Sequence, residues 1–198
     1  MEMSLNQRDY SIWDEHTNYF TLDTLKLFLR LCGCSLIHYD RHNFSGTCIY
    51  VVGKASNDYS ISFNYLDASL RKIEKYSSEW PLFKEKAFNY FQELKRDNNK
   101  IAVYGLSARI FSILDYLGVP RNYIDLFIDD NQDKIDALAF QSTTSDQLYQ
   151  NDIDVCILGV SGENEDLVVQ KHKKFIDNGG KFISLLPPSN LLPDFWFK

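Results

Sequence analysis

Ile101-Ala-Val-Tyr-Gly-Leu-Ser-Ala-Arg109 is the stretch that decides the fold, because an apolar run passes through a glycine straight into helix-forming residues. Residues 101–104 predict a short buried strand, and Gly105 predicts the tight turn that follows it. Residues 107–117 repeat apolar side chains at helical spacing, and Gly118 is typical of a helix end. The order of these signals predicts a strand, a turn and a helix.

A second apolar run at residues 124–128 completes a β-turn-α-β unit and ends in Asp129 and Asp130. In such a unit the backbone N–H groups at the helix N-terminus, together with the helix dipole, form a pocket for an anion. We therefore expect this half of the chain to hold a phosphorylated ligand, or to descend from a domain that held one.

The remaining residues of the C-terminal half repeat the alternation of strand and helix. Residues 154–158 and 181–186 predict buried strands, and residues 163–178 predict the helix between them. Alternating strands and helices are typical of a parallel sheet with helices on both faces. Residues 100–198 are therefore expected to form a small Rossmann-like α/β domain.

The N-terminal part contains a predicted helix at residues 22–31 and a predicted hairpin with strands at residues 34–39 and 47–52. One helix and one hairpin bury too little area to fold alone, so residues 1–62 are expected to pack on something else. Residues 63–99 predict a helical connector to the Rossmann-like domain.

Three local signals set the expected helix ends in these parts. Thr21 or Asp23 can cap the first helix. In the connector, the pair Ser77-Ser78 predicts a break, and Pro81 predicts the start of a second helix.

Composition excludes several classes of partner. A formal net charge of −6 argues against nucleic acid, which favours a basic face. No apolar run approaches the roughly 18 residues of a membrane span, and no signal peptide precedes Asp9. The four cysteines form no CxxC pair, so we expect reduced cytosolic thiols and no metal site. The protein is thus expected to be cytoplasmic.

The glycine turn raises the question of a dinucleotide. The usual glycine pattern would occupy positions 105, 107 and 110, where this chain has Gly105, Ser107 and Ile110. Asp129 stands near the place of the ribose-binding acid, which keeps a dinucleotide site as one alternative. The favoured alternative is a Rossmann-like domain without a dinucleotide, in which Arg109 and the turn bind a simpler phosphate.

Several motifs, taken in order, resemble the C-terminal part of the sugar-nucleotide C-methyltransferases. They are Asp-Glu-His-Thr-Asn-Tyr-Phe at residues 14–20, the stretch at 101–109, and the segments at 128–134 and 179–183 with Pro187 after them. The resemblance covers nearly the whole chain. It implies binding of a nucleoside-diphosphate sugar by a Rossmann-like domain.

The resemblance also implies roles for individual residues. Glu15 and His16 would be the acid/base pair that deprotonates the sugar carbon, a task that suits an imidazole because its pKa lies near neutrality. The alternative is a surface Glu-His pair at a helix start. The predicted substrate-binding residues are Tyr19, Gly105, Ser107, Arg109 and Asp129.

In that family a zinc-binding segment and an S-adenosylmethionine domain precede the Glu-His motif, so the resemblance implies that this chain begins after the methyl-donor site. We therefore expect a split subunit or a shortened protein. It would bind no cofactor alone, receive S-adenosylmethionine through a missing domain or a partner, and be inactive without it. The hairpin would then expose a strand edge, which predicts a homodimer that pairs the two hairpins.

Three departures from the family pattern leave the function open. Trp13 replaces a tyrosine, Phe44-Ser45-Gly46 replaces His-Gly-Gly, and Val160-Ser161 replaces Trp-Asn. Either the substrate differs or the chemistry has lapsed. The alternatives to a methyltransferase portion are a non-catalytic Rossmann-like nucleotide or sugar-nucleotide module, and an enzyme of another class, such as a small oxidoreductase.

Overall fold

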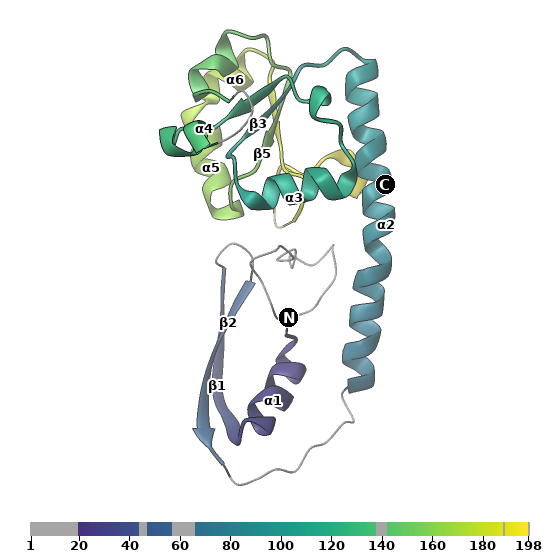
Figure 1. Cartoon of the computed structure of the whole chain (residues 1–198), viewed down its shortest axis with the longest axis vertical. Helices are drawn as coiled ribbons and strands as arrows, with labels where there is room; N and C mark the ends of the chain where they lie inside the picture. Colours follow the sequence, from purple (N-terminus) through teal and green to yellow (C-terminus); the bar gives the residue numbers. More distant parts are fainter. Residues whose placement is uncertain (1–19, 44–46, 57–65, 138–141, 188, 198) are drawn as a thin grey trace. The chain divides into compact units, whose positions relative to one another are not determined.

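The chain divides into two compact units, Met1–Trp80 and Pro81–Lys198 (Figure 1). The computed structural model describes residues 20–43, 47–56, 66–137, 142–187 and 189–197. Within them, no helix has the length and apolar character needed to cross a membrane.

A four-stranded parallel sheet with the order β4-β3-β5-β6 forms the centre of the C-terminal unit. Its strands are β3 (Ile101–Tyr104), β4 (Leu126–Ile128), β5 (Val155–Leu158) and β6 (Lys181–Ile183). Every residue of β3 and β5 is buried, as expected for inner strands that helices cover on both faces. The predicted α/β class with a parallel sheet is confirmed.

One face of the sheet packs against η3 (Ser145–Tyr149), α5 (Gly162–Lys171) and α6 (Lys173–Asp177). The core on this face joins strand and helix side chains that are all nearly inaccessible. They include Tyr104, Cys156, Leu148, Val168 and Phe175. The prediction of a single helix over residues 163–178 is wrong, because His172 leaves the helical conformation between α5 and α6.

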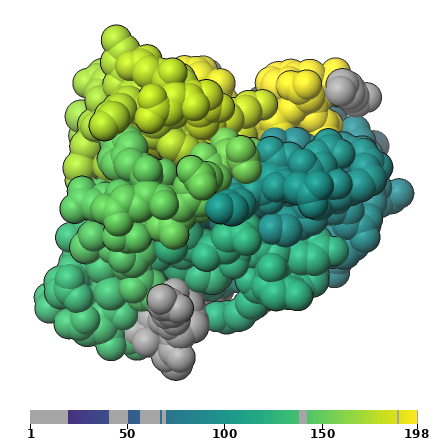
Figure 2. Space-filling view, turned by 90° about the horizontal axis from the view of Figure 1, so that it is seen from above, coloured from purple at the N-terminus to yellow at the C-terminus, as the bar shows by residue number. Residues whose placement is uncertain are grey.

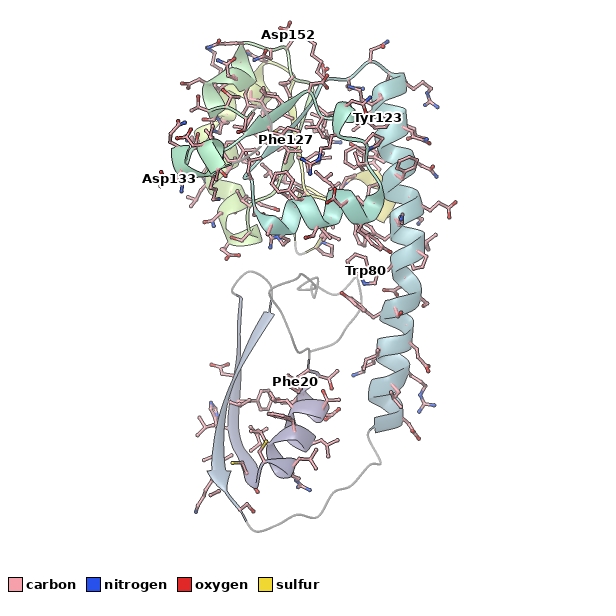
Figure 3. The ribbon with its side chains drawn as sticks, viewed as in Figure 1. Phe20, Trp80, Tyr123, Phe127, Asp133 and Asp152 are labelled. Carbon is pink, nitrogen blue, oxygen red and sulfur yellow. The ribbon has the colours of Figure 1, made fainter. Side chains whose placement is uncertain are left out.

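The opposite face belongs to α3 (Ala108–Leu117) and to the second half of α2. Because successive strand residues alternate between faces, Val103 and Phe127 point to this side. The Phe127 ring lies 6.1 Å from that of Phe111 on α3, and Figure 3 shows it inside the unit, with Asp133 of α4 (Gln132–Ala137) at the outside. Four residues of α3 are buried: Ile110, Ile113, Leu114 and Leu117.

The C-terminal segment folds back onto α2 (Figure 2, yellow beside blue-green). The Phe83 and Trp196 rings are 5.3 Å apart, and the Trp196 indole Nε1 donates a 3.0 Å hydrogen bond to the Leu185 carbonyl. Trp196 belongs to the short turn η4 (Asp194–Trp196). These contacts fix the second half of α2 to the end of the sheet.

Helix α2 is continuous from Leu66 to Arg96, which corrects the expectation of a break and a new start at Pro81. Instead of ending the helix, the Ser78 hydroxyl donates to the Lys75 carbonyl of the preceding turn at 2.8 Å. Downstream of the proline, the buried side chains of Ala87 and Phe91 hold the helix in place. Packing therefore overrides the local signals.

The N-terminal unit contains α1 (Leu22–Leu31) and an antiparallel hairpin of β1 (Cys34–Asn43) and β2 (Thr47–Ala55). Thr21 caps α1: its hydroxyl accepts the Thr24 N–H, and the Thr24 hydroxyl accepts the Thr21 N–H in return. Both strands are longer than predicted.

Candidate functional site

The order of the strands creates a topological switch point beside β3, where the strand order reverses its direction across the sheet. The chain leaves β3 through α3 to reach β4 on one side, while β5 lies on the other side of β3. In open α/β sheets, ligands bind outside the carboxyl ends of the strands at such a point. Here the two loops that meet there are residues 105–107 after β3 and residues 159–161 after β5.

Two glycines allow these loops to touch. Gly105 has φ +89°, and a Cβ on it would lie 2.6 Å from Val160 Cγ1. A Cβ on Gly159 would lie 2.3 Å from the Gly105 carbonyl oxygen, which no real side chain allows. Gly159 was not among the predicted site residues, although it follows its strand directly, as Gly105 does.

Ser107 connects the same two loops. Its hydroxyl donates to the Gly159 carbonyl at 3.0 Å and also accepts the Ile110 N–H at 3.4 Å, so Ser107 is the N-cap of α3. This hydroxyl takes the place of the second glycine of the dinucleotide pattern. A side chain thus fills space that a pyrophosphate would need in order to lie flat on the turn.

Arg109 reaches across the switch point from the first turn of α3. Its guanidinium Nη2 donates to the Val160 carbonyl at 2.6 Å. It also lies near enough to the buried Glu165 of α5 to favour the charged form of that carboxyl. Burial nevertheless raises the pKa of Glu165 above its usual value. The hydrogen bond from Ser189 and the charge of Arg109 both lower this pKa, but burial has the larger effect.

Asp129, which follows the neighbouring strand β4, stabilises the turn at Gly105 through hydrogen bonds. The residue is only 6% exposed, and its Oδ2 accepts the Leu106 N–H at 2.8 Å. Its Oδ1 accepts the Asn131 N–H at 2.9 Å, and the Lys134 ammonium lies 3.2 Å from Oδ2. Protein donors therefore engage the acid that would bind ribose in a dinucleotide site.

The two helices that begin at the switch point differ in charge. The first turn of α5 contains Glu163 and Glu165, which already complement its dipole. The first turn of α3 begins with the exposed Ala108 and carries Arg109 as its charge. An anionic ligand is therefore favoured at α3 and disfavoured at α5.

A separate polar cluster lies where β3 and β4 end, on the face that α5 covers. The Tyr104 hydroxyl and the Lys171 ammonium both donate to Asp130 Oδ2. Burial opposes ionisation of Asp130, but hydrogen bonds from Lys171, Ser145 and Tyr104 outweigh it and hold the pKa of Asp130 well below its usual range. Burial, and then the bond to Asp130, raise the pKa of Tyr104.

His172 lies beside this cluster and is only 3% exposed. Its Nδ1 is 2.8 Å from the Tyr149 hydroxyl, and its ring meets that of Tyr104 edge to face, 5.5 Å between centroids. Within the described residues, Nε2 has no hydrogen-bond partner. Burial, followed by the charge of Lys171, lowers the pKa of His172. Neither this histidine nor the cluster was predicted from the sequence.

Of the predicted site residues, the structure brings Gly105, Ser107, Arg109 and Asp129 together at one edge of the sheet. Glu15, His16 and Tyr19 lie outside the described residues. No group of three or more His, Cys, Asp or Glu side chains able to hold a metal ion occurs in the described ranges.

The family model for the C-methyltransferase C-terminal domain matches residues 67–187, which run from the start of α2 past the last strand of the sheet. No curated protein matches the chain. The family match covers more than half of the sequence and includes both loops of the switch point, so the chain belongs to the C-methyltransferase C-terminal domain family.

Proposed function

We propose that the C-terminal unit binds a nucleoside-diphosphate sugar as the substrate of a C-methyl transfer, with the diphosphate at the switch point between β3 and β5. The observation that carries the proposal is the contact of the Gly105 turn with the Gly159 loop. It places a helix N-terminus and Arg109 at the edge where open α/β sheets bind ligands.

The chemistry of Arg109 supports a phosphate as its ligand. Its guanidinium is a planar, permanently charged fork that matches a phosphate in bidentate geometry, and its bond to the Val160 carbonyl fixes it at the loop after β5. The carbonyl bond holds the side chain at the mouth of the site before a ligand arrives. Less conformational entropy is then lost when the phosphate binds.

The geometry favours a sugar nucleotide over a dinucleotide. Ser107 stands at the position of the second glycine, and main-chain N–H groups and Lys134 engage Asp129. A diphosphate that contacts the end of α3 from one side needs neither the missing glycine nor a ribose contact at Asp129.

For the chemical step, we propose the roles that the family resemblance implies. Glu15 and His16 would take the proton from the sugar carbon that is to be methylated. S-adenosylmethionine would reach that carbon through another domain or a partner chain.

Calorimetric titration of the chain with UDP-, dTDP- and GDP-sugars tests the binding proposal. We expect saturable binding of at least one of them, weakened about tenfold or more in Arg109→Ala, because charge-assisted hydrogen bonds contribute about 1.5–3 kcal/mol. Arg96→Ala is the matched control, since Arg96 ends α2 before β3 begins, and it should bind like the wild type. No binding of any sugar nucleotide, or unchanged binding by Arg109→Ala, would contradict the proposal.

A further inference from the structure

Lys134 of α4 lies beside the glycine turn, although neither its position in the sequence nor its helix suggests this. Its Nζ is 3.2 Å from Asp129 Oδ2, and the same oxygen accepts the Leu106 N–H at 2.8 Å. One carboxylate oxygen therefore joins the lysine ammonium to the backbone of the turn. The ammonium and the turn amide must then be close neighbours.

Asp129 does not depend on this lysine. Two main-chain N–H groups, those of Leu106 and Asn131, donate to its two oxygens. Hydrogen bonds of this kind stabilise a carboxylate in its charged form. The buried Asp129 carboxylate therefore keeps hydrogen-bond donors on both oxygens when Lys134 moves away.

Lys134 is also able to move. Its side chain is 48% exposed, and four rotatable bonds separate the ammonium from the backbone. The lysine end of the pair is half exposed, so water can solvate the ammonium when it leaves the buried Asp129 carboxylate. The pair with Asp129 thus holds a movable cation at the turn.

We propose that Lys134 is the second cation of the diphosphate site and makes the site selective for a diphosphate over a monophosphate. The inference rests on the proposed function. Arg109 of α3 and Lys134 of α4 approach the same turn from different helices, and a diphosphate presents two phosphoryl groups to them. Arginine binds one as a fork, whereas the lysine neutralises the other as a point charge.

The test titrates the full chain with the 5′-diphosphates of the five common nucleosides, and with the matching monophosphates. For the best pair we expect Lys134→Gln to weaken diphosphate binding about fivefold to tenfold and monophosphate binding less than twofold. Lys134→Arg should restore the preference for the diphosphate. Lys181→Gln is the control, because this exposed lysine begins β6 at the amino edge of the sheet, and it should bind like the wild type.

The outcomes separate this inference from the proposed function. Suppose that the wild type binds a diphosphate and that Lys134→Gln binds both ligands with wild-type affinity. The proposed role of Lys134 is then wrong, whereas the proposed diphosphate site is retained. An equal loss for both ligands would also contradict selectivity, and Lys134→Arg failing to rescue would contradict a charge contact. If the wild type binds no nucleotide, both proposals fall. Thermal unfolding of each variant confirms that the fold is intact.

Discussion

Both units of the chain contain amphipathic segments, but the two units differ in how many apolar residues these segments bury. In the C-terminal unit every residue of β3 and β5 is buried, and α3 buries four residues. In the part of the chain that the structure describes, α1 buries none, and Leu31 and the hairpin residue Ile37 are 64% and 63% exposed. An apolar stripe thus produces a core only where the same unit supplies the opposing surface.

This difference separates two kinds of surface. The C-terminal unit has its own core and presents polar groups where β3 and β5 end, which suits a ligand. The N-terminal unit presents apolar side chains beside strands that, within the described residues, pair only with each other. Large exposed apolar patches and open strand edges are typical of interfaces between chains.

The largest expected effect is association through the N-terminal unit. We predict a homodimer with a dissociation constant of about 10 μM, or roughly 7 kcal/mol, because pairing two hairpins covers one open strand edge of each. Ile37→Lys should give a monomer, since a charge on an edge strand opposes pairing. Leu167→Lys on α5, where the leucine is equally exposed at 63%, should remain dimeric. Light scattering that finds the wild type monomeric at several hundred micromolar would rule out the dimer.

A smaller effect, on the free energy of unfolding, is expected when one glycine in each unit is replaced by alanine in separate variants. Gly159→Ala should destabilise the C-terminal unit by about 3 kcal/mol, because the new Cβ would meet the Gly105 carbonyl at 2.3 Å. Gly53→Ala in β2 should change stability by less than about 0.5 kcal/mol, since its Cβ would find ordinary contacts at 3.7 Å or more.

Urea unfolding followed by circular dichroism measures both changes, and tryptophan fluorescence adds a signal from Trp196, which is hydrogen-bonded inside the C-terminal unit. Equal effects of the two substitutions would mean that the loops after β3 and β5 do not touch as described.

The smallest expected effect is a dependence of the C-terminal unit on pH. Burial and Lys171 lower the pKa of His172 in the fold, so the unfolded chain binds a proton first as the pH falls. The stability that neutral His172 contributes is complete above the unfolded pKa of about 6.5 and is lost as the pH falls through its folded value. Asp130 and Asp146 oppose this shift from the neighbouring elements.

Thermal unfolding between pH 7.5 and 5 should show this decline in the wild type and a flatter profile in His172→Gln. Tyr149→Phe is a useful companion, because it removes the hydroxyl that meets Nδ1 and leaves the ring. Parallel profiles for the wild type and His172→Gln would contradict the assignment to this histidine.

Local signals predicted much of the C-terminal unit. Gly105 and Gly118 have the positive φ angles that such turns require, and α3 begins one residue after its predicted start because Ser107 is its N-cap. Each of these depends on neighbours within a few residues, which a sequence displays directly. The same holds for Thr21, which caps α1.

Contacts between distant segments could not be predicted in this way. Gly159 is required by a carbonyl oxygen 54 residues earlier, and Lys171 meets an aspartate 41 residues earlier. Lys134 appears in sequence as an ordinary surface residue, because its link to the turn runs through Asp129, whose carboxylate accepts an N–H from Leu106, 23 residues earlier. The continuity of α2 through Pro81 likewise depends on buried residues beyond the proline.

The most direct test of the central claim follows backbone amide resonances while a nucleoside diphosphate, or the sugar nucleotide that binds best, is added to the ¹⁵N-labelled chain. We expect saturable shifts at Gly105, Leu106, Ala108 and Gly159, around the switch point, and none at Gly53 in the hairpin. Saturable binding that leaves the amides around Gly105 and Gly159 unshifted would contradict it.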